Sequence, residues 1–137
     1  MTQTDSADHR ARCEQLLRES EAFEKVEDWD NAVAKYRELN DLDHLFQGAE
    51  SKLLFAVRER ECWHNYTTGT ALMAAGDYAG ALDAFRKAKA RAGVYRDTAA
   101  LIHECEQRLG APVAATAPQA EASARKGCLG VLLLLIC

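Results

Sequence analysis

Residues 71–90 read ALMAAGDYAGALDAFRKAKA, and this stretch decides the fold that the sequence predicts. Gly76 and Asp77 interrupt two runs that are rich in alanine, and glycine followed by aspartate is typical of the end of one helix and the start of the next. Beyond the interruption, apolar and small residues recur at spacings of three and four, as on one face of an α-helix. These residues are Tyr78, Ala81, Leu82, Phe85 and Ala88. The stretch therefore predicts a helical hairpin.

The same pattern occurs earlier in the chain, so the hairpin is one copy of a repeat. Asp28 returns as Asp77, 49 residues later. The other matched pairs are Ala22/Ala71, Phe23/Leu72, Trp29/Tyr78, Ala32/Ala81, Val33/Leu82, Tyr36/Phe85 and Phe46/Tyr95. Matches at apolar and small positions are what helix packing preserves. They predict an architecture in which both hairpins share one buried hydrophobic core. They do not indicate a chemical activity.

The repeat resembles the tetratricopeptide repeat signature. The residues that carry the resemblance are Gly69, Gly76-Asp77-Tyr78, Ala81, Phe85 and Ala88, with a weaker copy at Ser20, Trp29, Ala32 and Tyr36. The chain departs from the signature at its opening tryptophan, which is Asn65 here, and at its closing proline, which is Gly93. Its period of 49 residues also exceeds the usual value of about 34.

The extra length of the repeat ends in Tyr95-Arg96-Asp97-Thr98. This element is similar to the Tyr-Arg-Asp-Ala segment that begins a further helix in elongated repeats of bacterial signalling and defence proteins. The resemblance covers roughly residues 13–109. It implies stacked antiparallel helices and a role in binding other proteins rather than in catalysis.

Periodicity and capping residues predict an all-α domain over residues 1–109 with about five helices. The expected helices are Ser6–Val26, Trp29–Asn40, Phe46–Ala75, Tyr78–Ala92 and Arg96–Leu109, with Gly110 as the last C-cap. Within the long third helix, Gly69 is explained either by the close approach of a neighbouring helix or by a bend.

The composition indicates which class of partner the protein binds and in which cellular compartment it lies. The chain has 137 residues, a net charge of −4 and 28% charged residues, which is typical of one globular domain. Nucleic-acid affinity comes largely from clustered basic residues, so an acidic chain with interspersed charges predicts no nucleic-acid partner. Five widely spaced cysteines favour reduced thiols in a cytosolic setting, and the first residues lack the basic and apolar run of a secretory signal.

The composition changes after the predicted helices. Residues 110–126 contain both prolines of the chain and many alanines, which predicts a linker. Residues 127–137 form a hydrophobic C-terminal segment, predicted as a short helix. Its apolar residues are Leu129, Val131, Leu132, Leu133, Leu134, Leu135 and Ile136.

The apolar segment is too short to cross a membrane by itself. Ten helical residues reach about 15 Å, against roughly 30 Å of hydrocarbon. Arg125 and Lys126 stand where cytoplasmic flanks of a membrane segment stand. The sequence therefore predicts a shallow anchor at the cytoplasmic face of a membrane, or the first half of a spanning helix. Docking on the protein's own groove and self-association remain alternatives.

Several histidines and cysteines are spaced as metal ligands or as a nucleophile pair could be. They are His9 and Cys13, four residues apart on one helix face, then Cys62 and His64, and finally His103 and Cys105. The three cysteines lie on or near apolar stripes, where a thiol usually packs as a small hydrophobe. No orienting third group or phosphate-binding loop accompanies them. We therefore expect packing roles, no catalytic residue, no metal and no cofactor.

Together these patterns predict a non-catalytic interaction or scaffold module that binds another protein and associates with a membrane through its tail. The expected contact residues are Arg18, His64, Asn65 and Thr68, which are polar positions on the first helix of each hairpin. One alternative is a small metal-binding or thiol-reactive protein that uses the cysteines and histidines. The other is a self-assembling subunit, a homo-oligomer held together by the apolar tail.

Overall fold

The computed structural model describes residues 3–110, and this part of the chain is helical throughout apart from short connections. The elements are α1 (Gln3–Lys25), α2 (Trp29–Leu42), the short 3-10 helix η1 (Phe46–Gly48), α3 (Ala49–Ala74), α4 (Tyr78–Ala92) and α5 (Thr98–Gly110). The all-α prediction with five helices is confirmed. The predicted linker beyond Gly110 and the apolar segment at 127–137 lie outside the described residues.

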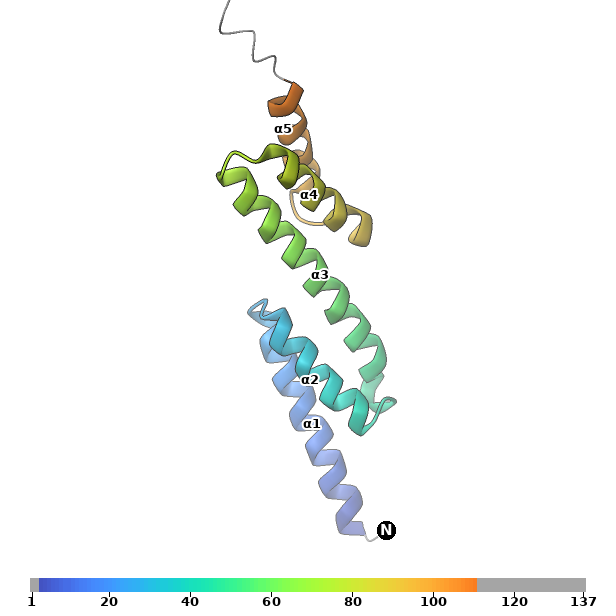
Figure 1. The fold of residues 1–137 in the computed structure, drawn as a ribbon. Helices are drawn as coiled ribbons and strands as arrows, with labels where there is room; N and C mark the ends of the chain where they lie inside the picture. Colours follow the sequence, from blue (N-terminus) through green and yellow to red (C-terminus); the bar gives the residue numbers. More distant parts are fainter. Residues whose placement is uncertain (1–2, 111–137) are drawn as a thin grey trace, which may run out of the picture.

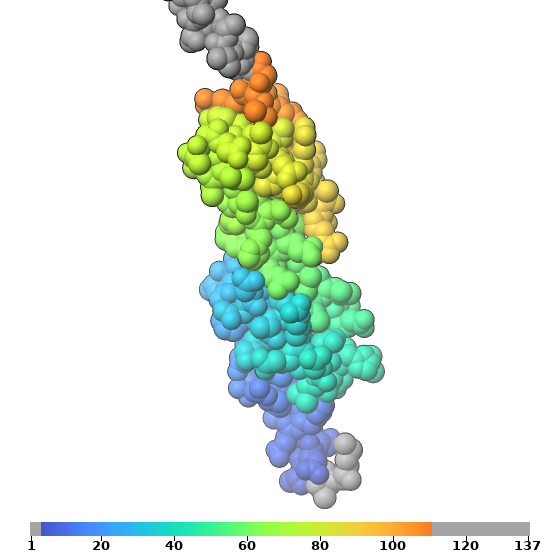
Figure 2. Space-filling model, viewed as in Figure 1, coloured from blue at the N-terminus to red at the C-terminus, as the bar shows by residue number. Residues whose placement is uncertain are grey.

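The long helix α3 forms the axis of the molecule (Figure 1). Consecutive helices pack as antiparallel pairs, with α2 and α1 on the first half of α3 and α4 and α5 on its second half. The space-filling view in Figure 2 shows the resulting elongated outline, with the start of α1 at one end and α5 at the other. No helix among residues 3–110 is both long and apolar enough to cross a membrane.

The two turns between paired helices have the same pattern of backbone hydrogen bonds. In the first, the carbonyl of Phe23 accepts hydrogen bonds from the backbone N–H groups of residues 26 and 28. In the second, the carbonyl of Leu72 accepts from residues 75 and 77. Asp28 and Asp77 then cap α2 and α4, because each side chain accepts from a backbone N–H in the first turn. The 49-residue repeat therefore describes the backbone as well as the sequence.

The connections that follow the paired helices also repeat. Gln47 has a φ of 45° and Arg96, 49 residues later, a φ of 46°. A left-handed residue breaks an α-helix, because its φ and ψ have the opposite sign to those of a right-handed helix. For this reason α3 begins at Ala49 rather than at Phe46, and α5 begins at Thr98 rather than at Arg96. The predicted starts of these two helices were wrong by two or three residues.

Two smaller boundaries differ as well. Helix α1 spans Gln3–Lys25 instead of Ser6–Val26, and α2 continues to Leu42 instead of ending near Asn40. At the other end of the described chain, α5 continues to Gly110, which is the last described residue, so the C-cap at Gly110 stays a prediction.

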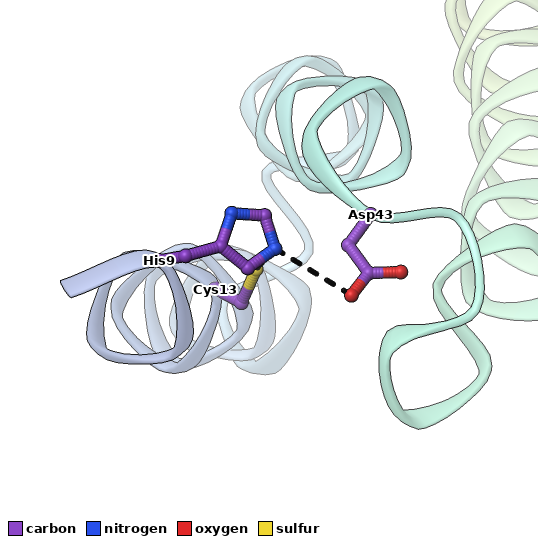
Figure 3. Close-up of side chains that lie close together, drawn as sticks. All are labelled: His9, Cys13 and Asp43. Carbon is purple, nitrogen blue, oxygen red and sulfur yellow. Dashed lines mark hydrogen bonds and ion pairs between the residues drawn. The ribbon is translucent and has the colours of Figure 1, made fainter. Parts of the chain in front are cut away.

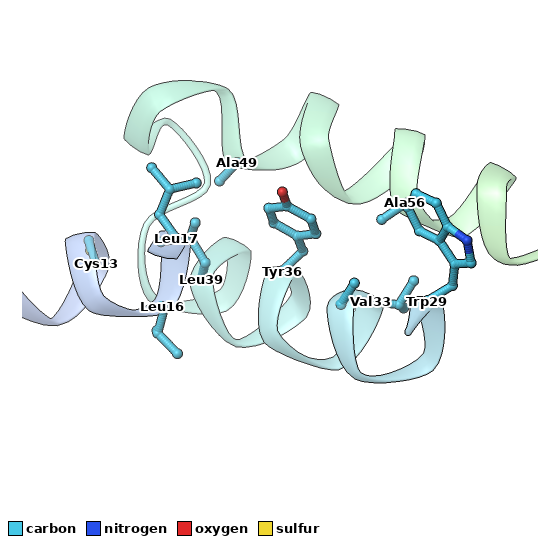
Figure 4. Close-up of a cluster of buried hydrophobic side chains, with 10 residues drawn as sticks. Cys13, Leu16, Leu17, Trp29, Val33, Tyr36, Leu39, Ala49 and Ala56 are labelled. Carbon is cyan, nitrogen blue, oxygen red and sulfur yellow. The ribbon is translucent and has the colours of Figure 1, made fainter. Parts of the chain in front are cut away.

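The buried side chains form two clusters rather than the single interior expected from the sequence. The first joins α1, α2 and the first half of α3, with Tyr36 between α2 and α3 (Figure 4). The second joins the other half of α3 to α4 and α5, with Phe85 at 0% exposure. Trp63 packs on the first cluster and Tyr66 on the second, and their rings stack 6.4 Å apart. Each half of α3 therefore belongs to a different core.

At Gly69, the ring of Phe85 from α4 packs against α3 where a side chain would otherwise lie. A Cβ atom added there would lie 2.6 Å from Cε1 of Phe85, and α3 runs without interruption from Ala49 to Ala74. Of the two explanations offered by the sequence, this contact supports the close approach of the neighbouring helix.

Candidate functional site

His9, Cys13 and Asp43 bring three potential metal ligands together at one end of the first hairpin (Figure 3). Nε2 of His9 lies 3.8 Å from Sγ of Cys13 and 3.6 Å from Oδ2 of Asp43. All three ligand atoms lie within 4.8 Å of one another. The cluster therefore converges on one point between α1 and the end of α2.

The fold positions each of these side chains by a different means. His9 and Cys13 are one helical turn apart on α1, which places both on the same face. Asp43 is the C-cap residue of α2, and its backbone N–H donates to the carbonyl of Leu39. Its Oδ1 accepts a hydrogen bond of 3.1 Å from the backbone N–H of Leu45, which leaves Oδ2 directed toward His9. The carboxylate is thus held in place by the loop that it begins.

Burial differs across this cluster. Cys13 is completely buried, whereas the side chains of His9 and Asp43 are 44% and 34% exposed. Burial raises the pKa of the Cys13 thiol, and the nearby negative charge of Asp43 raises it further. A thiol of this kind is a poor nucleophile at neutral pH, because the thiolate is the reactive form.

The other cysteines and histidines highlighted by the sequence stay apart from this cluster. Sγ of Cys62 lies 3.8 Å from the carbonyl of Ala88, and His103 contacts Gln107 on its own helix. Cys62 and Cys105 are both buried, and burial is the largest cause of the raised pKa of each thiol. These positions have the packing environment that the sequence favoured for them.

Arg96 forms a second notable arrangement, where the loop after α4 meets the turn between α1 and α2. Its guanidinium lies 4.9 Å from the ring centroid of Trp63, 5.4 Å from that of Tyr66 and 5.6 Å from that of Tyr95. It also pairs with Glu27, which is 69 residues away in the chain. Arg96 therefore connects the two helical pairs through a ring stack and an ion pair.

The neighbouring residues of the Tyr-Arg-Asp element have defined roles as well. Tyr95 is buried at 8% exposure, and Oδ1 of Asp97 accepts a hydrogen bond of 2.8 Å from the hydroxyl of Tyr66. The hydroxyl of Thr98 donates to the carbonyl of Tyr95 at the start of α5. The Tyr-Arg-Asp element thus connects the start of α5 to the middle of α3.

The four residues expected to contact a partner lie on the first helix of each pair, but in different surroundings. Arg18 and Thr68 are exposed. His64 is exposed but lies 3.4 Å from Asp30 of α2, so it also belongs to the contact between α2 and α3. Asn65 is half-buried and donates from Nδ2 to the carbonyl of Glu61 within α3.

Sequence reasoning missed Asp43 and Glu27. The only sequence signal for Asp43 is its place just beyond the end of an amphipathic helix. Glu27 lies in a turn, and no local pattern indicates a partner so far along the chain. Both residues act through contacts that the tertiary structure creates.

Comparisons of this chain with family models, with curated proteins and with solved structures find no match at a significant level.

Proposed function

We propose that the chain is a helical-repeat module that binds another protein and does not itself catalyse a reaction. The observation that carries this proposal is a pair of exposed apolar residues that the repeat preserves. Leu45 is 77% exposed and Val94, 49 residues later, is 92% exposed. Each precedes an aromatic residue, Phe46 or Tyr95, that packs inward. Packing accounts for the aromatic residue of each pair but not for its exposed neighbour.

Exposed apolar residues that recur in each repeat unit could contact a partner protein that extends across both units. Stacked helical repeats bind through extended surfaces of this kind, because neighbouring units present equivalent side chains in a row. The proposed contact residues are Leu45 and Val94, the exposed residues Arg18, His64 and Thr68, and the half-buried Asn65. Burial raises the pKa of the Cys13, Cys62 and Cys105 thiols, which makes these three residues poor nucleophiles at neutral pH.

The C-terminal residues support a location at the cytoplasmic face of a membrane as part of this proposal. The apolar run from Leu129 to Ile136 follows the basic pair Arg125 and Lys126. A short apolar anchor with a basic flank binds a lipid surface by partial burial and by attraction to anionic lipids. In this arrangement the tail holds the module near the membrane while the helices bind the partner.

Photo-crosslinking in living cells of the native host tests the partner-binding surface. A photoreactive amino acid is placed singly at Leu45, Val94 or Thr68, and at Lys87 on the exposed side of α4 as the control. We expect one protein to be crosslinked from the first three positions and not from Lys87. Equal crosslinking from all four positions, or none from any, would contradict the proposed surface.

Vesicle flotation tests the membrane part separately. The full chain is mixed with vesicles of phosphatidylcholine and phosphatidylserine, and is compared with a Leu133→Asp variant of the same length. We expect the unmodified chain to float with the vesicles and the variant to remain in solution. If the chain stays in solution but forms oligomers that the substitution dissolves, the self-assembly alternative replaces the anchor.

A further inference from the structure

We propose that His9, Cys13 and Asp43 form a binding site for a divalent transition metal, with Zn²⁺ as the ion that best suits the donor set. This inference is independent of the proposed partner surface. It also departs from the expectation that the sequence alone supports, in which Cys13 only packs. The difference comes from Asp43, which the fold adds to the pair of residues on α1.

The donor chemistry selects the class of ion. An imidazole nitrogen, a thiolate sulfur and a carboxylate oxygen are the three protein donors found around Zn²⁺, and thiolate disfavours Mg²⁺ and Ca²⁺. Four-coordinate zinc with three protein ligands leaves one position for water. The partial exposure of His9 and Asp43 provides access for the ion and for that water.

The distances in the metal-free cluster suit this geometry. Bonds of about 2.0–2.3 Å in a tetrahedron place neighbouring ligand atoms about 3.4–3.6 Å apart. Nε2 of His9 already lies 3.6 Å from Oδ2 of Asp43 and 3.8 Å from Sγ of Cys13. The remaining separation, from sulfur to carboxylate, is within 4.8 Å. A side-chain movement on the order of 1 Å would complete the site.

The loop around Asp43 is organised as a metal site requires. Ligating carboxylates are usually held by a second hydrogen bond that fixes their orientation. Here the backbone N–H of Leu45 binds Oδ1, and Oδ2 remains for the ion. The backbone of Asp43 is fixed at both ends, since its N–H donates to Leu39 and its carbonyl accepts from Phe46. Little ordering of this ligand is needed on binding.

The repeat distinguishes the site from ordinary packing. Cys13 corresponds to Cys62, and both are completely buried, so the thiol itself serves the architecture of both units. His9 corresponds to Arg58 and Asp43 to Ala92, neither of which could complete a metal site beside Cys62. The two additional ligands therefore occur together in one unit only. This is the arrangement expected of a site added to a repeated framework.

Binding would secure the projecting end of α1. Residues 4–12 are all exposed, and the next residue, Cys13, is buried. A metal held by His9 would connect this end of α1 to the loop that links α2 with α3. The ion would thereby add a bond to the end of α1, whose residues 4–12 are exposed.

Spectroscopy with Co²⁺ tests the site directly, because Co²⁺ occupies zinc sites and absorbs visibly when it is bound by thiolate in a tetrahedron. The full chain is used with Cys128→Ser and Cys137→Ser in every sample, so that tail thiols contribute no signal. We expect one Co²⁺ per chain with a thiolate charge-transfer band, and displacement of that band by equimolar Zn²⁺. The lack of such a band would overturn the proposal.

Substitutions assign the band to its ligands. Cys13→Ala should abolish the charge-transfer band, and His9→Ala or Asp43→Ala should weaken Co²⁺ binding at least tenfold, within the range seen when a ligand or its support is lost. Circular dichroism checks that each variant is folded, and the exposed position of His9 makes His9→Ala the variant least harmful to the fold. A band that survives Cys13→Ala would refute the assignment.

Two controls separate the site from general effects of losing a thiol or an imidazole. Cys62→Ala removes the equivalent buried cysteine, and His103→Ala removes an exposed histidine whose Nε2 contacts Gln107. Both should bind Co²⁺ like the parent chain. Zn²⁺ at about a hundredfold excess over its dissociation constant should raise the melting temperature of the parent by at least about 10 °C and leave that of Cys13→Ala unchanged. Loss of the band in Cys62→Ala would contradict the proposal.

Discussion

The contact between Gly69 and Phe85 makes a sharp prediction about the packing of α3 on α4. In a Gly69→Ala variant, the new methyl group would lie 2.6, 2.8 and 2.9 Å from three ring carbons of Phe85. Carbon atoms in contact prefer a separation of about 3.5–4.0 Å. The ring must therefore move by roughly 1 Å, or α4 must move away from α3.

Two opposing terms set the size of the effect. Alanine is about 1 kcal/mol more favourable than glycine inside a helix, which would stabilise the variant. Forcing an additional methyl group into a packed core costs about 1–3 kcal/mol. Phe85 is completely buried and lies 6.1 Å from the ring of Tyr66, so it has no free space to enter. We therefore expect the upper part of that range and a net loss of about 1–2 kcal/mol.

Urea unfolding followed by circular dichroism measures this loss. The matched control is Ser20→Ala, because Ser20 occupies the equivalent position in α1, is completely buried and already has a side chain there. Its hydroxyl bonds only to the carbonyl of Leu16 within the same helix. The lost hydrogen bond and the better helix propensity of alanine nearly cancel, so we expect a change below about 1 kcal/mol.

A double-mutant cycle identifies the cause. In the Phe85→Leu background the ring is absent, and Gly69→Ala should be neutral or stabilising. The coupling free energy between the two positions should then be about 1–3 kcal/mol in favour of the double variant. If Gly69→Ala alone matches or exceeds the stability of the parent chain, the close approach of α3 and α4 is refuted.

Three further predictions concern the helix caps, a buried phenol and the ring stack. Asp28→Ala and Asp77→Ala should each lower the free energy of unfolding by about 1 kcal/mol in urea titrations, while serine at either position should retain most of it. Burial and then the hydrogen bond to Glu24 raise the pKa of Tyr36 above its unfolded value of about 10. The contribution of Tyr36 to the free energy of unfolding should thus be complete below that pH and be lost as the pH rises further. When unfolding is measured at pH 8 and above pH 10, the free energy of unfolding of Tyr36→Phe should fall less between the two than that of the parent. Arg96→Gln should cost about 1–2 kcal/mol by thermal unfolding and Arg96→Lys less, because lysine keeps the charge without the planar stack.

A specific result would contradict each of these three predictions. Equal effects of alanine and serine at the caps would show that the side-chain oxygens do not cap the helices. An alkaline decline that is the same with and without the Tyr36 hydroxyl would assign it to other groups. A lysine variant as unstable as the glutamine variant would show that only the planar guanidinium stabilises the stack.

The repeated hairpins could be predicted because their cause is local. Asp28 and Asp77 cap helices through neighbouring backbone N–H groups, and the apolar spacing that follows each one records which face is buried. The α4 boundaries were predicted without error for this reason. The role of Gly69 was also within reach, since a residue without a side chain inside a long helix has few explanations.

The remaining features depend on tertiary contacts that local pattern does not contain. Gln47 and Arg96 adopt left-handed backbone conformations that neither residue type suggests, so the helix starts that follow them were misplaced. Arg96 finds Glu27 across 69 residues, and Asp43 meets His9 only because α2 folds back along α1. The division of the buried residues into two clusters follows from the length of α3, which extends beyond either pair of helices.

The membership of α3 in both clusters has a consequence for how the protein opens. The first half of α3 can lose protection from amide hydrogen exchange only if the cluster around Tyr36 is exposed. The second half can lose it only if the cluster around Phe85 is exposed. The two ends can therefore open independently, and the segment from Trp63 to Tyr66, where a residue of each cluster stacks on the other, should exchange last. Local melting at one end of the molecule would leave the helices of the other end folded.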